Sequence, residues 1–224
     1  MKERCVNFTT YEVRAALDSR LKQFRRPLSH QPHAKCDTAT LGLDGIWRFS
    51  RPTARGINKS LSDDDLRCPY GQVGDRLYVR EAWRLFEASV ECDHADFPCS
   101  CPEDGTPFYK ATHATGDGEK WTRSIHMPRS LSRILLEITE IKVERLKSIS
   151  RQDAAQQGLI QLPATGRYVV HQGGQYFGMA SGNPCEVFEW LWEETYGEKS
   201  WKANPWVWVV KFKIVSTNEQ GIDS

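Results

Sequence analysis

The stretch from residue 74 to residue 83, GDRLYVREAW, gives the strongest single indication of the fold. Apolar and polar residues alternate along it, which is the two-residue period of a β-strand with one buried face. That period sorts the side chains into two faces, with Leu77, Val79, Glu81 and Trp83 on one and Tyr78, Arg80 and Ala82 on the other. Glu81 therefore lies on the face that we expect to be buried. Because a buried carboxylate is costly unless it is paired, the sequence predicts a cationic or hydrogen-bonding partner for it.

Two other segments have strand character. In SRILLEITEIKVERL, residues 132 to 146, the apolar positions change parity near Thr139, which predicts a bulge or a sharp bend. The segment WVWVVKFKIV, residues 206 to 215, alternates between an apolar face and a face that carries Lys211 and Lys213. We expect its apolar face to be buried and its lysine face to be partly wet.

Three helices are marked by signals at their ends. Thr9 and Glu12 form a capping-box pattern, and the apolar stripe that follows predicts a helix that ends near residues 25 to 27. A short helix should begin at Ser150, and a longer one should run from Asn183 to a stop at Gly197. Residues 159 to 182, between these two helices, are rich in glycine and are expected to form a surface excursion.

These elements predict an α+β fold in one domain spanning residues 1 to 224. Short strands with isolated helices, without regular β-α alternation, favour a small mixed β-barrel with flanking helices over a Rossmann-like sheet. The segments at about 84 to 120, which is rich in cysteine, and 159 to 182 are expected to be insertions into that domain.

The composition is that of a globular protein, with 39% apolar and 26% charged residues. The net charge of +1 does not indicate a nucleic-acid binder, although basic residues cluster in the first 35 positions. Eight tryptophans are an unusual number, and each is either a core residue or a stacking platform for a base. We find no secretory signal and no apolar run near the roughly 20 residues needed to span a bilayer, so we expect a cytoplasmic protein that does not enter the membrane.

The seven cysteines suggest reduced thiols or a metal site more than a disulfide framework. Four candidate metal ligands lie within a ten-residue stretch of the insertion: Cys92, His94, Cys99 and Cys101. They predict either a structural zinc site, in which Cys68 is a possible replacement ligand, or free thiols in a surface hairpin. No other cofactor is expected.

Several basic and aromatic residues are candidates for ligand binding. Arg25 and Arg26, with Lys22, are suited to phosphate, and the alternative for either arginine is a structural ion pair with Glu81. Trp201 is the preferred stacking residue, and the Asn204 amide could read a base edge. The remaining candidates on the rim of a cleft are Arg80, His126 and Arg129.

Four blocks of sequence, in this order, resemble the phage and prophage branch of the ASCH-domain proteins. They are FTTYEVRAALDSRLKQFRRP, CPYGQVGDRLYVREAW, SIHMPRSLSRILLEIT and SWKANPWVWVVKF, and they extend from about residue 8 to residue 213. The resemblance implies a PUA-like mixed β-barrel with a cleft for RNA or a nucleoside. Some ASCH proteins are amidohydrolases that remove the acetyl group from N4-acetylcytidine, using a lysine, a threonine and a glutamate.

Residue by residue, this resemblance carries over only in part. Glu81 matches the family glutamate, and Arg25 and Arg26 match the arginines of the family motif. The family lysine falls on Leu21 and the family threonine on Phe24, and neither side chain can do that chemistry. Lys22 is one residue away, which on a helix is a rotation of about 100°.

Three functional hypotheses follow. The first is a module that binds RNA or a modified nucleotide in a cationic, aromatic-lined cleft. The second is an enzyme of the same cleft, either an N4-acylcytidine amidohydrolase or a ribonuclease, with Glu81 and Lys22 as catalytic residues. The third is a phage-encoded interaction factor that binds a host protein through the excursion at 159 to 182 and the cysteine-rich loop. The first two require the end of the first helix to lie against the strand that carries Glu81.

Overall fold

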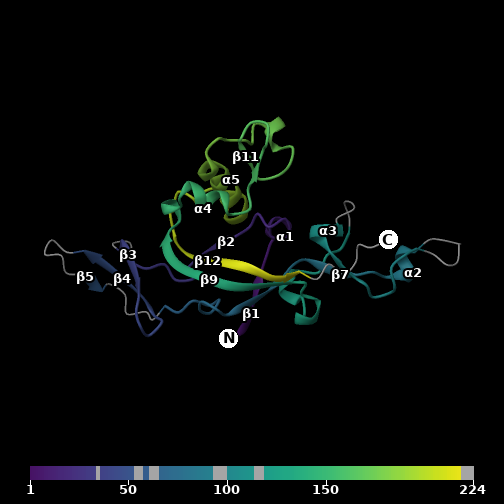
Figure 1. Ribbon diagram of the computed structural model, residues 1–224, viewed down its shortest axis with the longest axis horizontal. Coiled ribbons are helices and arrows are strands. Elements are labelled where there is room, and N and C mark those ends of the chain that lie inside the picture. Colours follow the sequence, from purple (N-terminus) through teal and green to yellow (C-terminus); the bar gives the residue numbers. More distant parts are fainter. Residues whose placement is uncertain (34–35, 53–57, 61–65, 93–99, 114–118, 218–224) are drawn as a thin grey trace.

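The computed structural model describes residues 1–33, 36–52, 58–60, 66–92, 100–113 and 119–217. Its centre is a five-stranded mixed sheet in the order β1-β6-β9-β12-β2 (Figure 1). The strands are β1 (Glu3–Asn7), β6 (Arg76–Arg80), β9 (Ile134–Arg145), β12 (Trp206–Thr217) and β2 (Gln23–Pro27). β1 runs parallel to β6, and the other neighbouring strands are antiparallel. The predicted α+β class is confirmed, but the sheet is not a closed barrel, so the PUA-like barrel remains a prediction.

The strand predictions are largely confirmed. Leu77, Val79 and Glu81 are buried as one face, although β6 ends at Arg80 and Trp83 belongs to the separate strand β7 (Trp83–Leu85). The predicted bulge lies in the ladder between β9 and β12. Lys211 pairs with Glu140 and Phe212 pairs with Ile138, so the register skips Thr139. The change of parity in the sequence therefore marked a real irregularity of the sheet.

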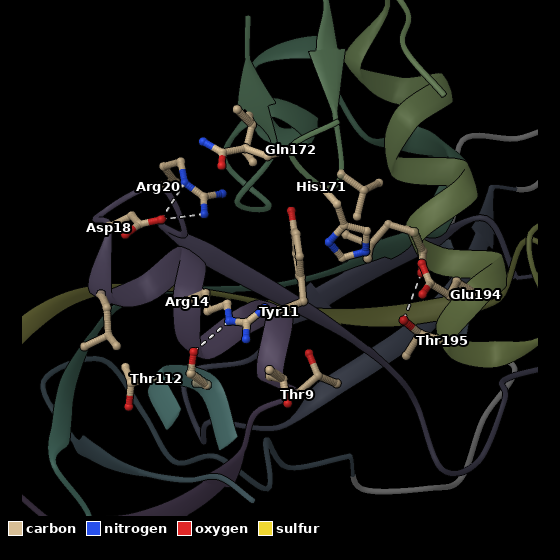
Figure 2. A pocket seen from close by; sticks show the side chains of 16 residues that line it. Thr9, Tyr11, Arg14, Asp18, Arg20, Thr112, His171, Gln172, Glu194 and Thr195 are labelled. Atoms are coloured by element: carbon tan, nitrogen blue, oxygen red, sulfur yellow. Dashed lines mark hydrogen bonds and ion pairs between the residues drawn. The ribbon is translucent and has the colours of Figure 1, made fainter. Parts of the chain in front are cut away.

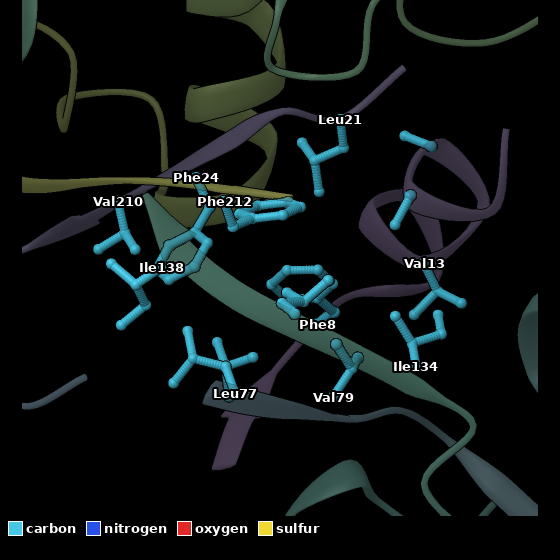
Figure 3. Packing of buried hydrophobic residues seen from close by; sticks show 14 of the residues in the cluster. Phe8, Val13, Leu21, Phe24, Leu77, Val79, Ile134, Ile138, Val210 and Phe212 are labelled. Carbon is cyan, nitrogen blue, oxygen red and sulfur yellow. The ribbon is translucent and has the colours of Figure 1, made fainter. Parts of the chain in front are cut away.

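The main hydrophobic core gathers side chains from all five strands of this sheet and from α1 (Thr10–Leu17) (Figure 3). Phe8, which follows β1, packs edge-on against Phe24 of β2 with ring centroids 5.7 Å apart. The Arg26 guanidinium also donates a hydrogen bond to the Asn7 carbonyl, at 3.1 Å. The two edge strands therefore approach each other through side chains. Within the described parts of the chain, no backbone hydrogen bonds of a β-ladder join β1 to β2.

The first helix, α1 (Thr10–Leu17), begins as predicted and ends earlier than predicted. Thr9 caps it with the reciprocal Glu12 capping box. The helix stops at Asp18, and Ser19 has a left-handed backbone with φ of 58°. Residues 23 to 27 form β2 instead, because their backbone pairs with β12. The predicted end near residues 25 to 27 is therefore wrong, since a long-range strand pairing overrides the local helical spacing.

The other two predicted helices are confirmed as α4 (Arg151–Ala155) and α5 (Pro184–Tyr196). Ser150 and Asn183 cap them, and Gly197 ends α5. α5 packs its buried stripe against Val207 and Val209 of β12, forming a second core cluster with Phe188 and Trp192. None of the helices in the described ranges is long and apolar enough to cross a membrane.

The remaining elements extend from this centre (Figure 1). At one end of the long axis lies a three-stranded sheet of β3 (Thr38–Leu41), β4 (Trp47–Pro52) and β5 (Asn58–Ser60). At the other end lie β7, α2 (Ala88–Glu91), β8 (Pro107–Tyr109) and α3 (Lys110–His113). The excursion at 159 to 182 contains the short hairpin of β10 (Ile160–Gln161) and β11 (Tyr168–Val169), followed by the 3-10 turn η4 (Gly174–Phe177). Three further 3-10 turns are η1 (Ser124–His126), η2 (Arg129–Leu131) and η3 (Leu146–Ser148).

Candidate functional site

Glu81 is buried and ion-paired, as its place in the sequence predicted, but its partner is Arg133. The Arg133 guanidinium donates to both carboxylate oxygens, Nε to Oε1 at 2.8 Å and Nη2 to Oε2 at 3.0 Å. It also lies over the Tyr109 ring, 4.2 Å from the centroid. Burial raises the pKa of Glu81, and the hydrogen bonds from Arg133 oppose that rise. The expected ion pair with Arg25 or Arg26 is wrong, because β6 pairs with β9 and thereby places Arg133 next to Glu81.

Arg25 and Arg26 are paired with other carboxylates. Arg25 is buried in β2 and donates to Glu144 at 2.8 Å. Arg26 donates to both oxygens of Glu12, at 2.8 and 3.0 Å. Both guanidinium groups are therefore largely neutralised by carboxylates, and neither meets Glu81.

The two positions that match the family's lysine and threonine are core positions. Leu21 and Phe24 are each 1% exposed and belong to the main core. Lys22 is exposed, and its backbone pairs with Gln156 and Phe212. Within the described residues, no hydrogen bond or ion pair joins Lys22 to Glu81. The catalytic arrangement expected for these residues is not assembled.

Trp201 and Asn204 have structural roles in the loop before β12. Trp201 is 8% exposed and packs edge-on against Phe188, so its ring is part of the second core cluster rather than a free stacking face. The Asn204 side-chain oxygen accepts a hydrogen bond from the Lys147 amide at 2.8 Å, and its carbonyl accepts one from Arg145. The prediction that they form a base-reading face is not supported by these contacts, because the loop uses both residues for its own packing.

Arg80, His126 and Arg129 do lie in one region. The guanidinium groups of Arg80 and Arg129 face the Tyr78 ring at 5.6 and 5.0 Å from its centroid. Arg80 also donates to the carbonyl of Ile125, beside the exposed His126, and Arg129 pairs with Glu3. These residues form a basic surface, which we call the Tyr78 patch.

Half of the predicted zinc ligands, His94 and Cys99, lie outside the described residues. Cys92, Cys101 and Cys68 are each partly buried, and burial raises the pKa of the Cys68 thiol to about 11. Among the residues that the structure describes, no three metal-ligating side chains are grouped around one point. The structural zinc therefore remains a prediction.

A cavity of about 1190 Å³ lies between α1, α5, α3 and the segment that follows β11 (Figure 2). α1 contributes Tyr11 and Arg14, which are three residues apart and therefore share one face of the helix. The segment after β11 contributes His171 and Gln172. The sequence predictions did not include any of these four residues. This cavity and a smaller one beside it, described below, form the site that we call the groove.

An aromatic pair lines the groove. The rings of Tyr11 and His171 meet edge to face, with centroids 5.7 Å apart and planes at 90°. The Tyr11 hydroxyl donates to the Gln157 carbonyl at 3.3 Å, which holds the ring in place. Burial raises the pKa of Tyr11 well above its usual value, so its phenol stays protonated at neutral pH.

The charges of the groove are only partly neutralised. Arg20 forms an ion pair with Asp18 at 2.7 Å. Arg14 is exposed and donates its Nε–H to the Ala111 carbonyl at 2.7 Å. No carboxylate among the described residues forms an ion pair with Arg14. Arg14 is therefore the cation of this cavity that is available to an anionic ligand.

A second cavity of about 170 Å³ adjoins the first and completes the groove. The two cavities share the lining residues Thr9, Tyr11, Leu191 and Thr195. β2 supplies Arg25 and Arg26 to this smaller cavity, and α5 supplies an aromatic wall of Phe188, Trp192 and Tyr196. This cavity therefore combines arginines with aromatic rings, and these rings come from α5 and α1 rather than from Trp201.

Comparison with known proteins does not assign this chain to a family. No family model matches it, and no curated protein and no solved structure matches it either. The ASCH resemblance therefore stays a prediction, and the groove itself is the basis for a functional inference.

Proposed function

We propose that the protein binds a nucleotide, or a short single-stranded RNA, in the groove between α1 and α5. The observation that carries this proposal is that two residues of α1, Tyr11 and Arg14, line the same cavity. The Tyr11 ring packs against His171, and Arg14 donates to a backbone carbonyl and forms no ion pair with a carboxylate of the described residues. Aromatic rings are the usual stacking platforms for unpaired bases. A guanidinium without a carboxylate partner is suited to a phosphate.

The size of the two cavities supports the same ligand class. The larger cavity, at about 1190 Å³, lies just above the range of about 300–1,000 Å³ for small-molecule sites, which leaves room for more than one nucleotide unit. The smaller one, at about 170 Å³, exceeds the space that one ordered water needs by roughly tenfold. A ring in the smaller cavity would lie among Tyr11, Trp192 and Tyr196, while the attached sugar and phosphate would extend toward Arg14.

We also propose that the fold is a relative of the PUA-like barrels. The four ordered sequence blocks support this relation, and so does the contact of Phe8 with Phe24 across the open edges of the sheet. The hydrolase and ribonuclease alternatives have no such support, since Lys22 is exposed and Glu81 is committed to Arg133.

One observation favours a second candidate function, the binding of a protein partner. The turn η4 exposes Tyr176 and Phe177, which are 83% and 85% accessible, at the tip of the 159 to 182 excursion. If this tip is the functional surface, the variant Tyr176→Ser/Phe177→Ser should lose a protein partner whose capture survives nuclease treatment. If the variant instead loses nucleotide binding and no such partner is found, Tyr176 and Phe177 would belong to the nucleotide-binding site.

Arg14→Ala is expected to weaken the binding of short single-stranded RNA by about tenfold or more, because it removes a charge-assisted hydrogen bond to phosphate. It should also reduce the slope of log affinity against log salt by about 0.7, the value of one phosphate contact on a single strand. Fluorescence anisotropy titrations at several salt concentrations measure both quantities.

The matched control is Arg67→Ala, because Arg67 is exposed and does not line the groove. This control should bind RNA as the wild type does. Wild-type protein that shows no affinity for RNA or nucleotides, or an affinity that does not depend on salt, would overturn the proposed function.

A further inference from the structure

We infer that the Tyr78 patch binds the phosphate backbone of a single-stranded RNA whose end occupies the groove, an inference that rests on the proposed function. The patch adjoins the groove through the ladder of β1 with β6. Asn7 lines the smaller cavity, and its partner in that ladder is Arg80 of the patch. Neighbouring strands are about 5 Å apart, and paired residues present their side chains to the same face of the sheet. An RNA strand that leaves the groove past Asn7 therefore reaches Arg80 next.

Most basic side chains of this region have no carboxylate partner. Arg80 is partly exposed and donates to the Ile125 carbonyl at 3.2 Å. Arg123, which immediately precedes η1, and His126, which ends it, are both exposed. No carboxylate among the described residues forms an ion pair with Arg80, Arg123 or His126. Two guanidinium groups and an imidazole are therefore available to an anionic ligand.

Arg129 is the exception, because its Nε–H donates to the Glu3 carboxylate. The two side chains of this pair are 47% and 39% exposed. An exposed ion pair contributes little to stability and is screened by salt, so a phosphate can compete with Glu3 for the guanidinium. Glu137, on the neighbouring strand β9, pairs with Lys213 at 2.7 Å. The patch therefore keeps an excess of positive charge.

The Tyr78 ring brings two of the guanidinium groups together. The central carbon atoms of Arg80 and Arg129 lie 5.6 and 5.0 Å from its centroid. A cation is attracted to the face of an aromatic ring, so we assign Tyr78 the role of a positioning residue. Guanidinium groups held in this way are suited to bidentate contacts with phosphate oxygens.

The arrangement of the cations favours a chain of phosphates over a single anion. Arg80 comes from β6, Arg123 and His126 from the region of η1, and Arg129 from η2. Because three segments supply these side chains, a backbone with a charge at each nucleotide can contact more of them than one phosphate can. The contact with the groove through Asn7 selects nucleic acid among the possible polyanions.

The test compares two ligands of the full chain: uridine monophosphate, which occupies the groove alone, and an RNA of about ten nucleotides, which extends to the patch. The variant Arg80→Gln/Arg129→Gln should bind the RNA about tenfold or more weakly. It should also reduce the slope of log affinity against log salt by about 1.4, the value of two phosphate contacts on a single strand. Its affinity for uridine monophosphate should equal that of the wild type. Anisotropy measures RNA binding and calorimetry measures nucleotide binding.

The matched control is Arg67→Gln/Lys202→Gln, which removes the same charge elsewhere on the surface. Both residues are exposed and neither lines the groove. This control should bind both ligands as the wild type does. If the patch variant does not fold, Arg123→Glu replaces it, because Arg123 is exposed, and this change should weaken RNA binding by roughly threefold to tenfold.

Two substitutions of Tyr78 test its positioning role. Tyr78→Leu removes the aromatic face and should weaken RNA binding by about threefold, with no change for uridine monophosphate. Tyr78→Phe keeps that face and should bind RNA as the wild type does. Equal RNA binding by Tyr78→Leu and Tyr78→Phe would contradict the role assigned to the ring.

The outcomes separate this inference from the proposed function. If the patch variant binds RNA as the control does, or if the RNA binds the wild type no more tightly than uridine monophosphate, the inference is overturned and the proposed function stands. If the patch variant loses RNA binding while Arg14→Ala does not and uridine monophosphate does not bind, the proposed function fails and the patch stands as the RNA surface. If the wild type binds phosphatidylserine vesicles and no RNA or nucleotide, both are overturned.

Discussion

Arg133→Met is expected to lower the free energy of unfolding by about 3–5 kcal/mol. The Arg133 side chain is 8% exposed and its Glu81 partner 2% exposed, and two short hydrogen bonds join them. Removing the guanidinium leaves a buried carboxylate with no counter-charge, and that is the costly event. Urea denaturation of the variant and the wild type at neutral pH measures the difference.

Two controls test whether the loss belongs to the buried charge. The double variant Arg133→Met/Glu81→Leu should recover most of the lost stability, because it removes the stranded carboxylate as well. Lys213→Met breaks an exposed pair with Glu137, in which the lysine side chain is 61% exposed, and should cost about 1 kcal/mol or less. A loss as small as this in Arg133→Met would contradict the structural role assigned to the Glu81–Arg133 pair.

The stability deficit of Arg133→Met should also depend on pH. Burial raises the pKa of Glu81 above its usual 4.5, and in the variant no guanidinium opposes that rise. A carboxyl with a raised pKa in the folded state favours folding below its unfolded pKa, and this contribution is lost as the pH rises through the folded pKa. The deficit should therefore be small below pH 4.5 and grow toward neutral pH. A deficit that grows toward acid pH would contradict this account.

Phe24→Thr is expected to lower the free energy of unfolding by about 3–5 kcal/mol, the range for losing a buried phenylalanine side chain. Phe24 is 1% exposed and packs against the rings of Phe8, Tyr70 and Phe212. The substitution restores the residue type that the ASCH resemblance places here, so it also tests whether this position belongs to a core or to a cleft. Thermal and chemical denaturation provide the measurement.

The matched control for this change is Phe177→Thr. Phe177 is 85% exposed, so its replacement should alter the free energy of unfolding by no more than about 0.5 kcal/mol. If Phe24→Thr is as stable as this control, then position 24 is not a core position and the structural description of β2 fails.

The parts of the fold that the sequence predicted well depend on local signals. The capping box of Thr9 and Glu12, the ends of α5 and the bulge near Thr139 are each encoded by residues close together in the chain. The end of α1 was predicted wrongly, because the pairing of β2 with β12 joins segments that are far apart in sequence. Local spacing contains no information about such a pairing.

The contrast between local signals and long-range pairing also explains which parts of the candidate site could be predicted. The burial of Glu81 followed from strand alternation, but its partner Arg133 depends on how β9 pairs with β6. Arg25 and Arg26 line the smaller cavity, whose aromatic wall belongs to α5, an element that the sequence analysis did not connect with them. One signal could have indicated it: Trp192 and Tyr196 are four residues apart and therefore share a face of that helix.

The central claim is that the groove between α1 and α5 holds the ligand, and an NMR titration of the isotopically labelled protein with uridine monophosphate tests it most directly. We predict that the shift changes concentrate on the backbone amides of Thr9 to Arg14 and Leu191 to Tyr196, and on the indole N–H of Trp192. Shift changes confined to the Tyr78 patch, or no changes at millimolar nucleotide, would contradict the claim.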